Sequence, residues 1–477
     1  MRFILAVIFA IFCSVASAVE PTILVNSATG SDTEASGAGP STALFGAAGV
    51  TAADGLTVIL DGTPNLSGVA TDGSAVLFMS DTNAGSKNFC KITAVDDGTD
   101  TVTVATAFQA LNTDAWAIGG KRASVASTTS KKLFETNGTA GDALPGWTIE
   151  MGSGHTETIA ATVNFRRAGD TTSGRIVLQG TPGAVTPPVL TFSNNGVAFA
   201  NASAIGNWTF QYFTLKNSNA TKTASQGFGL AASGSGMTFR GLIISDASNK
   251  FWQGIYTNAA SNVLIDGCDI GNTANHGIHR NSSTNVRITN NYIHGCGGHG
   301  INLAAPTGYF IYGNIIASNT GDGINFTSPS GCFVSHNTIY GNGGDGIEVS
   351  ADAGVSYSFE NNQITDNSGY GVNFSGGSQL VGRNYSDTVI RGNNTYNNTL
   401  GATNPTSISL NDPAVNPGYT NVGAFNWAIS SATAGMGHPE GVIFGSGTAS
   451  YPDPGAAQQQ PATAANLALP SLGRRWR

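Results

Sequence analysis

A Gly-Ile pair recurs every 23 residues through the middle of the chain. The pairs begin at Gly254, Gly277, Gly300, Gly323 and Gly346, and a Gly-Val pair begins 25 residues later at Gly371. Two further apolar columns keep these intervals. One is Ile265, Ile288, Ile311, Val334 and Phe359, and the other is Ile270, Ile293, Ile316, Ile339 and Ile364. Three columns with one period indicate an internal repeat.

Within one repeat the apolar and polar residues alternate. Ile301 and Leu303 are apolar with Asn302 between them, which is the period of a β-strand rather than of a helix. A unit of this length, built from short strands and turns rich in Gly and Asn, is typical of one coil of a parallel β-solenoid. We therefore expect an all-β fold whose apolar columns stack inside, with adjacent coils about 4.8 Å apart.

Asparagines form two columns of their own. The first is Asn291, Asn314, Asn337 and Asn362, preceded by Cys268, and the second is Cys296, Asn319, Asn342 and Asn367. Stacked amides can hydrogen-bond along the column and satisfy buried turn backbone. Cys332 falls in an inward column with Val263, Val286, Tyr309 and Tyr357. The pattern predicts buried free thiols at these cysteines, with a Cys268–Cys296 disulfide as the alternative.

These repeats resemble the right-handed parallel β-helix proteins of the pectate-lyase-like group. The likeness is carried by segments such as Asn337-Thr338-Ile339 followed by Gly344-Asp345-Gly346-Ile347. It implies a right-handed solenoid and a secreted protein. Residues 25–32 are similar to the opening strand and glycine turn of secreted members, and residues 412–425 and 451–456 are similar to their closing segment.

The rest of the chain divides around this solenoid. We predict a signal peptide at 1–18, an opening strand and cap at 19–48, an inserted antiparallel β-domain at 49–125, the β-helix at 126–400, a closing segment at 401–455 and a flexible basic tail at 456–477. The inserted domain is recognised by short strand patterns and by the hairpin turn at 96–100. It would cap the open end of the solenoid or serve as a binding module.

The beginning of the chain predicts export. Arg2 is followed by ten apolar residues at 3–12, and Ala16-Ser17-Ala18 fits the small-x-small cleavage rule. Ten apolar residues are too few to span a bilayer, and no other run reaches that length. We therefore expect a secreted or cell-surface protein with no membrane span.

Composition narrows the class of protein. Only 10% of residues are charged, against roughly 25% in an ordinary domain, and the net charge is −8. There are 63 glycines without a three-residue period, and 40% of residues are hydrophobic, which excludes a collagen, a coiled coil and a disordered chain. The acidic, sparsely charged surface argues against nucleic acid as a partner.

One candidate site is the column of residues that directly precede the glycines of the Gly-Ile pairs, which we call the rung glycines. His276, His299, Asp322 and Asp345 occupy it, and Glu348 lies three residues beyond Asp345. Stacking would bring Asp322 beside Asp345, with His299 and Glu348 close by. Two such carboxylates disfavour joint ionisation unless a cation or a proton lies between them. This predicts a Ca²⁺ site at Asp322, Asp345 and Glu348, or an acid/base pair for glycoside cleavage; alternatively, these residue types simply suit turns.

The known enzymes of this fold are matched only in part. Gly298-His299-Gly300 resembles an element of the polygalacturonase-type hydrolases, but the other elements of that pattern are missing. Pectate lyases use a Lys or Arg base beside acidic calcium ligands, and the regular rungs contain only Arg280 and Arg287. Arg280 occupies a nominally inward position that the sequence does not explain. If the protein is an enzyme, the resemblance implies a polysaccharide lyase or a glycoside hydrolase.

A second candidate site is aromatic. Alternation along the strand at 309–312 turns Phe310 and Tyr312 outward, with Phe333 one coil above Phe310 and Arg287 one coil below. Outward rings suit the apolar faces of sugars, or else a loop or another copy of the chain covers them.

Two functions remain open. One is a secreted protein that binds, and in the stronger form cleaves, extracellular polysaccharide, with His276 and Glu348 joining the aromatic residues in binding. The other is a non-catalytic surface, adhesin or virion-spike protein whose aromatic residues are covered by homo-oligomerisation. Fold does not decide between them.

Overall fold

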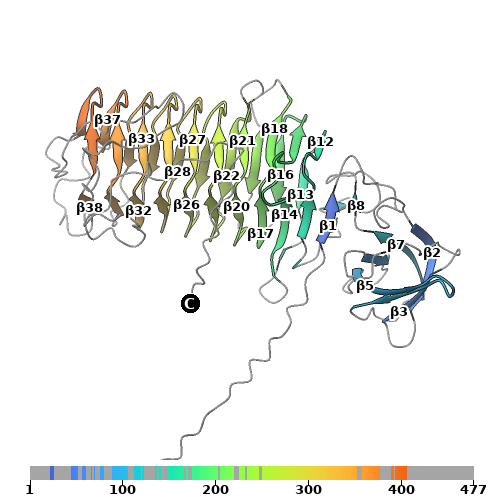
Figure 1. Cartoon of the computed structure of the whole chain (residues 1–477). Helices are drawn as coiled ribbons and strands as arrows, with labels where there is room; N and C mark the ends of the chain where they lie inside the picture. Colours follow the sequence, from blue (N-terminus) through green and yellow to red (C-terminus); the bar gives the residue numbers. More distant parts are fainter. Residues whose placement is uncertain are drawn as a thin grey trace, which may run out of the picture.

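The computed structural model is a long parallel β-solenoid with a small antiparallel barrel near its N-terminal end (Figure 1). It describes residues 148–404 except 166–167, 170–173, 202–204, 220–224, 231–233, 247–249, 352–356, 376–387 and 392, and it also describes 22–25, 44–51, 56–60, 66, 69, 76–79, 89–105, 112–119, 121–122, 135–136, 139–140 and 146. The predicted signal peptide, the tail and residues 405–455 of the closing segment lie outside these ranges. No helix in the described ranges is long and apolar enough to cross a membrane.

Each coil of the solenoid contributes one strand to each of three parallel sheets. In the described residues sheet 1 has twelve strands, because two strands from before residue 148 also join it, and sheets 2 and 3 have ten each. The strands of sheet 1 are β1 (Thr22–Val25), β8 (Lys121–Arg122), β11 (Thr148–Met151), β14 (Ile176–Gly180), β17 (Trp208–Gln211), β20 (Thr238–Arg240), β23 (Leu264–Asp266), β26 (Arg287–Thr289), β29 (Phe310–Tyr312), β32 (Cys332–Ser335), β35 (Tyr357–Glu360) and β38 (Thr388–Arg391).

Sheets 2 and 3 continue each coil after its sheet 1 strand. The strands of sheet 2 are β12 (Thr156–Ile159), β15 (Val189–Phe192), β18 (Thr214–Asn217), β21 (Ile243–Ser245), β24 (Asp269–Gly271), β27 (Tyr292–His294), β30 (Ile315–Ala317), β33 (Thr338–Tyr340), β36 (Gln363–Thr365) and β39 (Asn394–Tyr396). The strands of sheet 3 are β13 (Val163–Phe165), β16 (Val197–Asn201), β19 (Gln226–Leu230), β22 (Gln253–Asn258), β25 (Ile278–Asn281), β28 (Ile301–Ala304), β31 (Ile324–Thr327), β34 (Ile347–Ala351), β37 (Tyr370–Asn373) and β40 (Gly401–Asn404).

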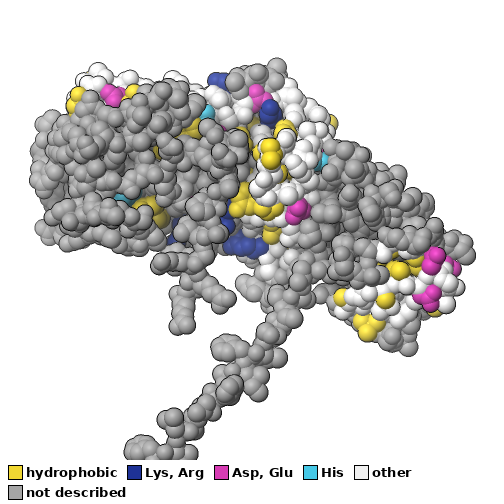
Figure 2. Space-filling view, in the orientation of Figure 1, with side chains coloured by type: hydrophobic (Ala, Val, Ile, Leu, Met, Phe, Trp, Pro, Cys, Tyr) yellow, Lys and Arg dark blue, Asp and Glu magenta, His cyan; other side chains and the backbone are white. Residues whose placement is uncertain are grey.

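The inserted domain is a closed antiparallel barrel in the order β2-β3-β6-β5-β4-β7, as the sequence predicts in outline. Its strands are β2 (Leu44–Thr51), β3 (Thr57–Leu60), β4 (Val76–Met79), β5 (Phe89–Asp96), β6 (Thr101–Val104) and β7 (Asn112–Gly119), and a two-stranded pair, β9 (Glu135–Thr136) and β10 (Thr139–Ala140), follows. Asp96 and Asp97 are exposed on the turn from β5 to β6, and acidic side chains gather on the barrel in Figure 2. The domain boundaries given above stay a prediction.

The three apolar columns stack inside the solenoid as predicted. Ile278, Ile301, Ile324 and Ile347 pair in register along sheet 3, and all are buried. The glycine before each isoleucine has a steric reason: a Cβ on Gly323 would lie 2.4 Å from Cγ2 of Ile339 and 2.7 Å from the carbonyl oxygen of Gly346. The rung glycine therefore lets consecutive coils approach closely.

Both asparagine columns form hydrogen-bonded ladders. The backbone N–H and the amide of Asn314 both donate to Oδ1 of Asn337, at 2.9 Å each, and Asn337 donates in the same way to Asn362. The ladder is buried, so each amide satisfies turn backbone that water cannot reach.

The cysteines Cys268, Cys296 and Cys332 are free and buried. The alternative Cys268–Cys296 disulfide is therefore wrong. Each thiol occupies a different stacked column, and the backbone N–H groups of Cys268 and Cys296 donate to asparagines of the next coil. Burial raises the pKa of Cys268 to about 12 and that of Cys296 to about 11, so these thiols stay neutral.

The early coils are filled by aromatic rings. Phe210 lies at their centre, with ring centroids 5.0 Å from Phe228, 5.5 Å from Phe199 and 5.8 Å from Phe239. Later coils have more isoleucine and valine in the interior, together with a few aromatic residues such as Phe326 and Phe359.

Candidate functional site

The two candidate sites lie on different sheets. His276, His299, Asp322 and Asp345 directly precede glycines at the edge of sheet 3, and Glu348 lies within β34 of that sheet. Arg287, Phe310 and Phe333 are neighbours in register on sheet 1, with Tyr312 on the same strand as Phe310. The molecule therefore offers two separate surfaces rather than one combined cleft. We call them the pre-glycine column and the aromatic wall.

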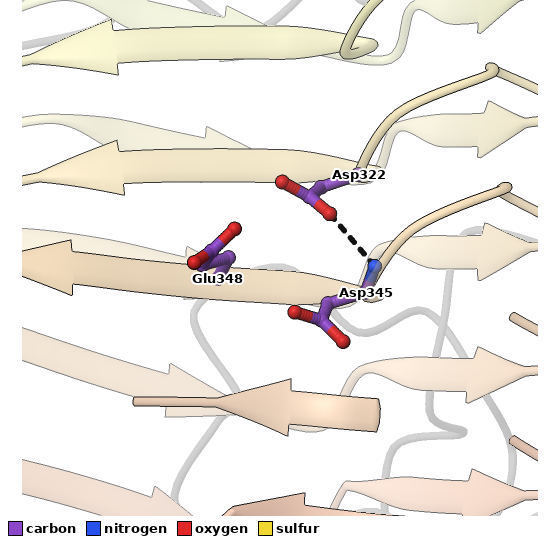
Figure 3. Close-up of side chains that lie close together, drawn as sticks. All are labelled: Asp322, Asp345 and Glu348. Carbon is purple, nitrogen blue, oxygen red and sulfur yellow. Dashed lines mark hydrogen bonds between the residues drawn. The ribbon is translucent and has the colours of Figure 1, made fainter. Parts of the chain in front are cut away.

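The pre-glycine column is a ladder from side chain to backbone. The N–H of His299 donates to Nδ1 of His276 at 3.1 Å, and the N–H of Asp322 donates to Nδ1 of His299 at 2.9 Å. The N–H of Asp345 then donates to Oδ1 of Asp322 at 2.7 Å, as Figure 3 shows, and the N–H of Tyr370 donates to Oδ1 of Asp345 at 2.6 Å. This accounts for the residue types, because each position requires a hydrogen-bond acceptor.

The ladder also buries the two aspartates. Asp322 is 5% exposed and Asp345 is 8% exposed, so these two carboxyls are largely shielded from water rather than displayed on the outside of the sheet. The reason is the direction of the side chains: each carboxyl turns along the solenoid axis to meet the next coil instead of pointing away from the sheet. Glu348 is half-buried and is the most accessible carboxyl of the three.

Amides and a hydroxyl connect the three carboxyls. Asn325 Nδ2 donates to Oδ2 of Asp322 and to Oε2 of Glu348, at 3.1 Å each. Asn373 Nδ2 donates to Oδ2 of Asp345 at 2.7 Å, and Ser375 Oγ donates to Oε1 of Glu348 at 2.7 Å. One ligand atom from each carboxyl lies within 4.8 Å of the others (Figure 3).

The pKa values of the three carboxyls are shifted in opposite directions. Burial alone raises the pKa of Asp322, but hydrogen bonds from His299 and from the Asp345 N–H outweigh it and hold the pKa below its ordinary value. Burial raises the pKa of Glu348, and the Asp322 charge raises it further. Burial and the charge of Asp322 also raise the pKa of Asp345. Acid/base catalysis uses neighbouring carboxyls whose pKa values are shifted in opposite directions.

The histidines of the column are fixed by stacking. The rings of His276 and His299 are stacked, with centroids 5.1 Å apart. Burial, together with the neighbouring His279 and His299, lowers the pKa of His276 to about 3, so it is neutral. Nδ1 of His299 lies 2.9 Å from the Asp322 N–H and 3.0 Å from Oδ2 of Asp322. It can accept the first hydrogen bond or, when protonated, donate the second, but it cannot do both.

Calcium would find oxygen ligands here, since carboxylates and amide carbonyls are what this cation prefers. Asp322, Asp345 and Glu348 would hold it through their carboxylate oxygens. Within the described residues the ion-pair partner of this cluster is His299, and no Lys or Arg pairs with these three carboxyls. Calcium binding and catalysis by Asp322, Asp345 and His299 stay predictions.

Glu348→Gln tests the protonation of the cluster. We expect the variant to be more stable than the wild type at pH 7 in EDTA, because the amide stays neutral and can donate to Asp322. An ordinary glutamate titrates near pH 4.3, and the folded pKa is higher. Wild-type stability is therefore lost as pH rises from about 4.3 through the folded pKa. Thermal unfolding should reveal the gain at pH 7 and none at pH 4.

Calcium should make the wild type more stable than Glu348→Gln, the reverse of the order expected in EDTA. Added Ca²⁺ at pH 7 should raise the wild-type midpoint and leave that of Glu348→Gln nearly unchanged, because the variant lacks one charged ligand. Equal responses of the two proteins would contradict a calcium site.

The aromatic wall is a row of parallel, offset rings. Phe310 and Phe333 have centroids 5.2 Å apart with an interplanar angle of 8°, and Phe310 and Tyr312 have centroids 5.6 Å apart at 10°. Rings this close cannot lie edge to edge in one plane, so they overlap in an offset stack rather than tile the sheet. The guanidinium of the exposed Arg287 lies 5.9 Å from the Phe310 ring centroid.

Several neighbours of these sites escaped the sequence reasoning. Ser375 reaches Glu348 from the following coil, and His336 contacts the Tyr312 ring at 5.1 Å between centroids. Ser375 follows a coil of 25 rather than 23 residues, so the regular spacing did not point to it. The stacked positions of Asn325 and Asn373 follow from the repeat, but their hydrogen bonds to the carboxyls do not.

Comparisons with known proteins agree with the fold. The family model described as "Right handed beta helix region" matches residues 186–307 and 253–412. None of the curated proteins compared with the chain matches it.

Solved structures of low identity are similar in fold alone. Pectate lyase Pel9A has a TM-score of 0.46 and 15% identity, over 66% of this chain and 88% of that chain. The A-module of the mannuronan C-5 epimerase AlgE4 from Azotobacter vinelandii has a TM-score of 0.36 and 16% identity, over 54% of this chain and 86% of that chain. The Dettilon tailspike protein gp208 has a TM-score of 0.31 and 13% identity, over 54% and 62%. The match to residues 186–412 and the three parallel sheets agree on the fold of the solenoid, which is that of a right-handed parallel β-helix.

Proposed function

We propose that the protein is secreted and binds an extracellular polysaccharide on its aromatic wall. One observation carries the proposal: Phe310, Tyr312 and Phe333 form an ordered, partly exposed row that ends at the exposed Arg287. Because these rings stack on one another, a sugar would contact the partly exposed side of the row, and the C–H faces of sugar rings are apolar.

Arg287 suggests which polysaccharide is preferred. A guanidinium binds carboxylates through paired hydrogen bonds, and this one is exposed beside the ring of Phe310. Uronic-acid polymers present both a carboxylate and an apolar ring face in every unit. We therefore propose acidic rather than neutral polysaccharide as the ligand.

Alanine at Phe310 or at Phe333 should weaken binding at least tenfold, since a buried aromatic contact is commonly worth more than about 1.4 kcal/mol. Affinity electrophoresis against uronic-acid polymers and neutral glucans measures the effect. Leu264→Ala is the matched control, because Leu264 occupies the same column next to Arg287. Arg287→Gln should reduce binding to the acidic polymers alone. Wild-type affinity in Phe310→Ala and Phe333→Ala would contradict the proposal.

Cleavage at the pre-glycine column is the second candidate function. It is supported by the opposite pKa directions of Asp322 and Glu348, whose carboxyls are joined through Asn325. The same polymers, assayed for reducing ends and for unsaturated products with and without EDTA, distinguish hydrolysis from lyase chemistry. Activity abolished by Asp322→Ala together with Asp345→Ala would support catalysis there. Absence of both activity and binding, with a stable trimer in solution, would support the surface, adhesin or virion-spike alternative.

A further inference from the structure

Arg280 lies inside the solenoid. It belongs to β25, where it pairs in register with Thr257 of the preceding coil and Leu303 of the next. Its side chain is directed into the interior between the coils, and the residue is 1% exposed. An arginine in such a position requires explanation, because arginine is almost never fully buried without a partner.

Hydrogen bonds within the protein satisfy only one of the three guanidinium nitrogens of Arg280. Nε donates to Oγ1 of Thr257 at 3.3 Å, and Cζ lies 4.9 Å from the centroid of the Tyr309 ring. Nη1 and Nη2 are buried and have no hydrogen-bond partner in the protein. The buried hydroxyls of Tyr309 and of Ser283, on the turn after β25, also have none.

The charge of Arg280 is also uncompensated. Burial lowers its pKa to about 9, which still leaves the guanidinium positive at neutral pH. In the described part of the chain no carboxylate forms an ion pair with it. Cys332 is its electrostatic neighbour, but burial raises the pKa of that thiol to about 12. The neutral thiol donates to the carbonyls of Ser330 and Pro306, at 3.5 and 3.6 Å.

We propose that Arg280 binds a chloride ion in the interior of the β-helix, with the Tyr309 hydroxyl as a further donor. The unpaired guanidinium nitrogens are donors only, so their ligand must be an acceptor. Water would accept these hydrogen bonds but would leave the charge uncompensated, which is costly in an apolar interior. A monatomic anion supplies both the acceptor and the missing negative charge, and it fits between stacked coils more easily than a polyatomic anion.

Urea unfolding in sodium chloride and in sodium gluconate, at equal ionic strength, tests the proposal. Urea is required because guanidinium chloride would supply the ion. The wild-type midpoint should be higher in chloride by on the order of 0.5 M, and that of Arg280→Leu should be the same in both salts. Arg287→Leu removes an exposed arginine one coil away and should keep the wild-type response. A midpoint difference that persists in Arg280→Leu would overturn the proposal.

A second measurement does not depend on whether Arg280→Leu folds. Wild-type protein refolded and crystallised in sodium bromide should give an anomalous peak within hydrogen-bond distance of Nη1 or Nη2. Refolding in bromide is needed because a sealed site exchanges slowly once it is folded. Well-ordered density for Arg280 without an anomalous peak would overturn the proposal.

Discussion

Asn337→Leu is expected to destabilise the protein by about 4 kcal/mol, because the substitution leaves buried polar groups without partners. Asn337 is fully buried, and its Oδ1 accepts from both the N–H and the amide of Asn314. Its Nδ2 donates to the carbonyls of Ile311 and Ser335 and to Oδ1 of Asn362. Leucine has a similar volume but makes none of these five hydrogen bonds.

Urea unfolding followed by circular dichroism measures this loss. Asn281→Ala is the control, because Asn281 is exposed on β25, and it should change stability by less than about 0.5 kcal/mol. If Asn337→Leu costs no more than the control, the ladder is not what holds the coils together.

Phe210→Ala should cost about 3–5 kcal/mol, the usual range for truncating a buried aromatic residue. The ring is fully buried and stacks on Trp208 at 5.7 Å between centroids, with Phe165 at 5.5 Å. The surrounding rings are held by their own coils, so they cannot close the cavity that alanine would leave.

A Phe-to-Ala substitution on the aromatic wall provides the comparison for the stability loss. Phe310→Ala removes a half-buried ring and should cost about 1 kcal/mol, so that this variant remains folded for the binding experiment. Equal unfolding free energies for the two variants would contradict the interior position of Phe210 and the exterior position of Phe310.

The aromatic wall and the pre-glycine column are separate surfaces with different kinds of side chain. The aromatic wall lies on sheet 1, where side chains of the same column have register neighbours 23 residues apart. The pre-glycine column lies at sheet 3 and is tied into the backbone by its own acceptors. A polymer bound along the aromatic wall need not reach the pre-glycine column, so the proposed binding and the proposed cleavage can be tested separately.

Much of the fold could be read from the repeat. A constant interval of 23 residues assigns each residue its stacked neighbours, and parallel pairing in register then follows. This correctly placed the isoleucine columns, the asparagine ladders, the free thiols, and Phe333 beside Phe310. The same interval brought Asp322, Asp345 and Glu348 together, as the structure does.

The sequence by itself thus determined which residues are neighbours, because stacking depends only on the period. Only the tertiary structure decided where the side chains point and what they contact. Asp322 and Asp345 turn along the axis and accept backbone N–H groups, a choice between rotamers that no spacing encodes. The alternation of the sequence assigns Arg280 an inward position but does not show what surrounds it. The structure places its guanidinium beside the Tyr309 ring. Likewise, the two candidate sites separate onto different sheets because the turns between strands, rather than the period, set the cross-section of each coil.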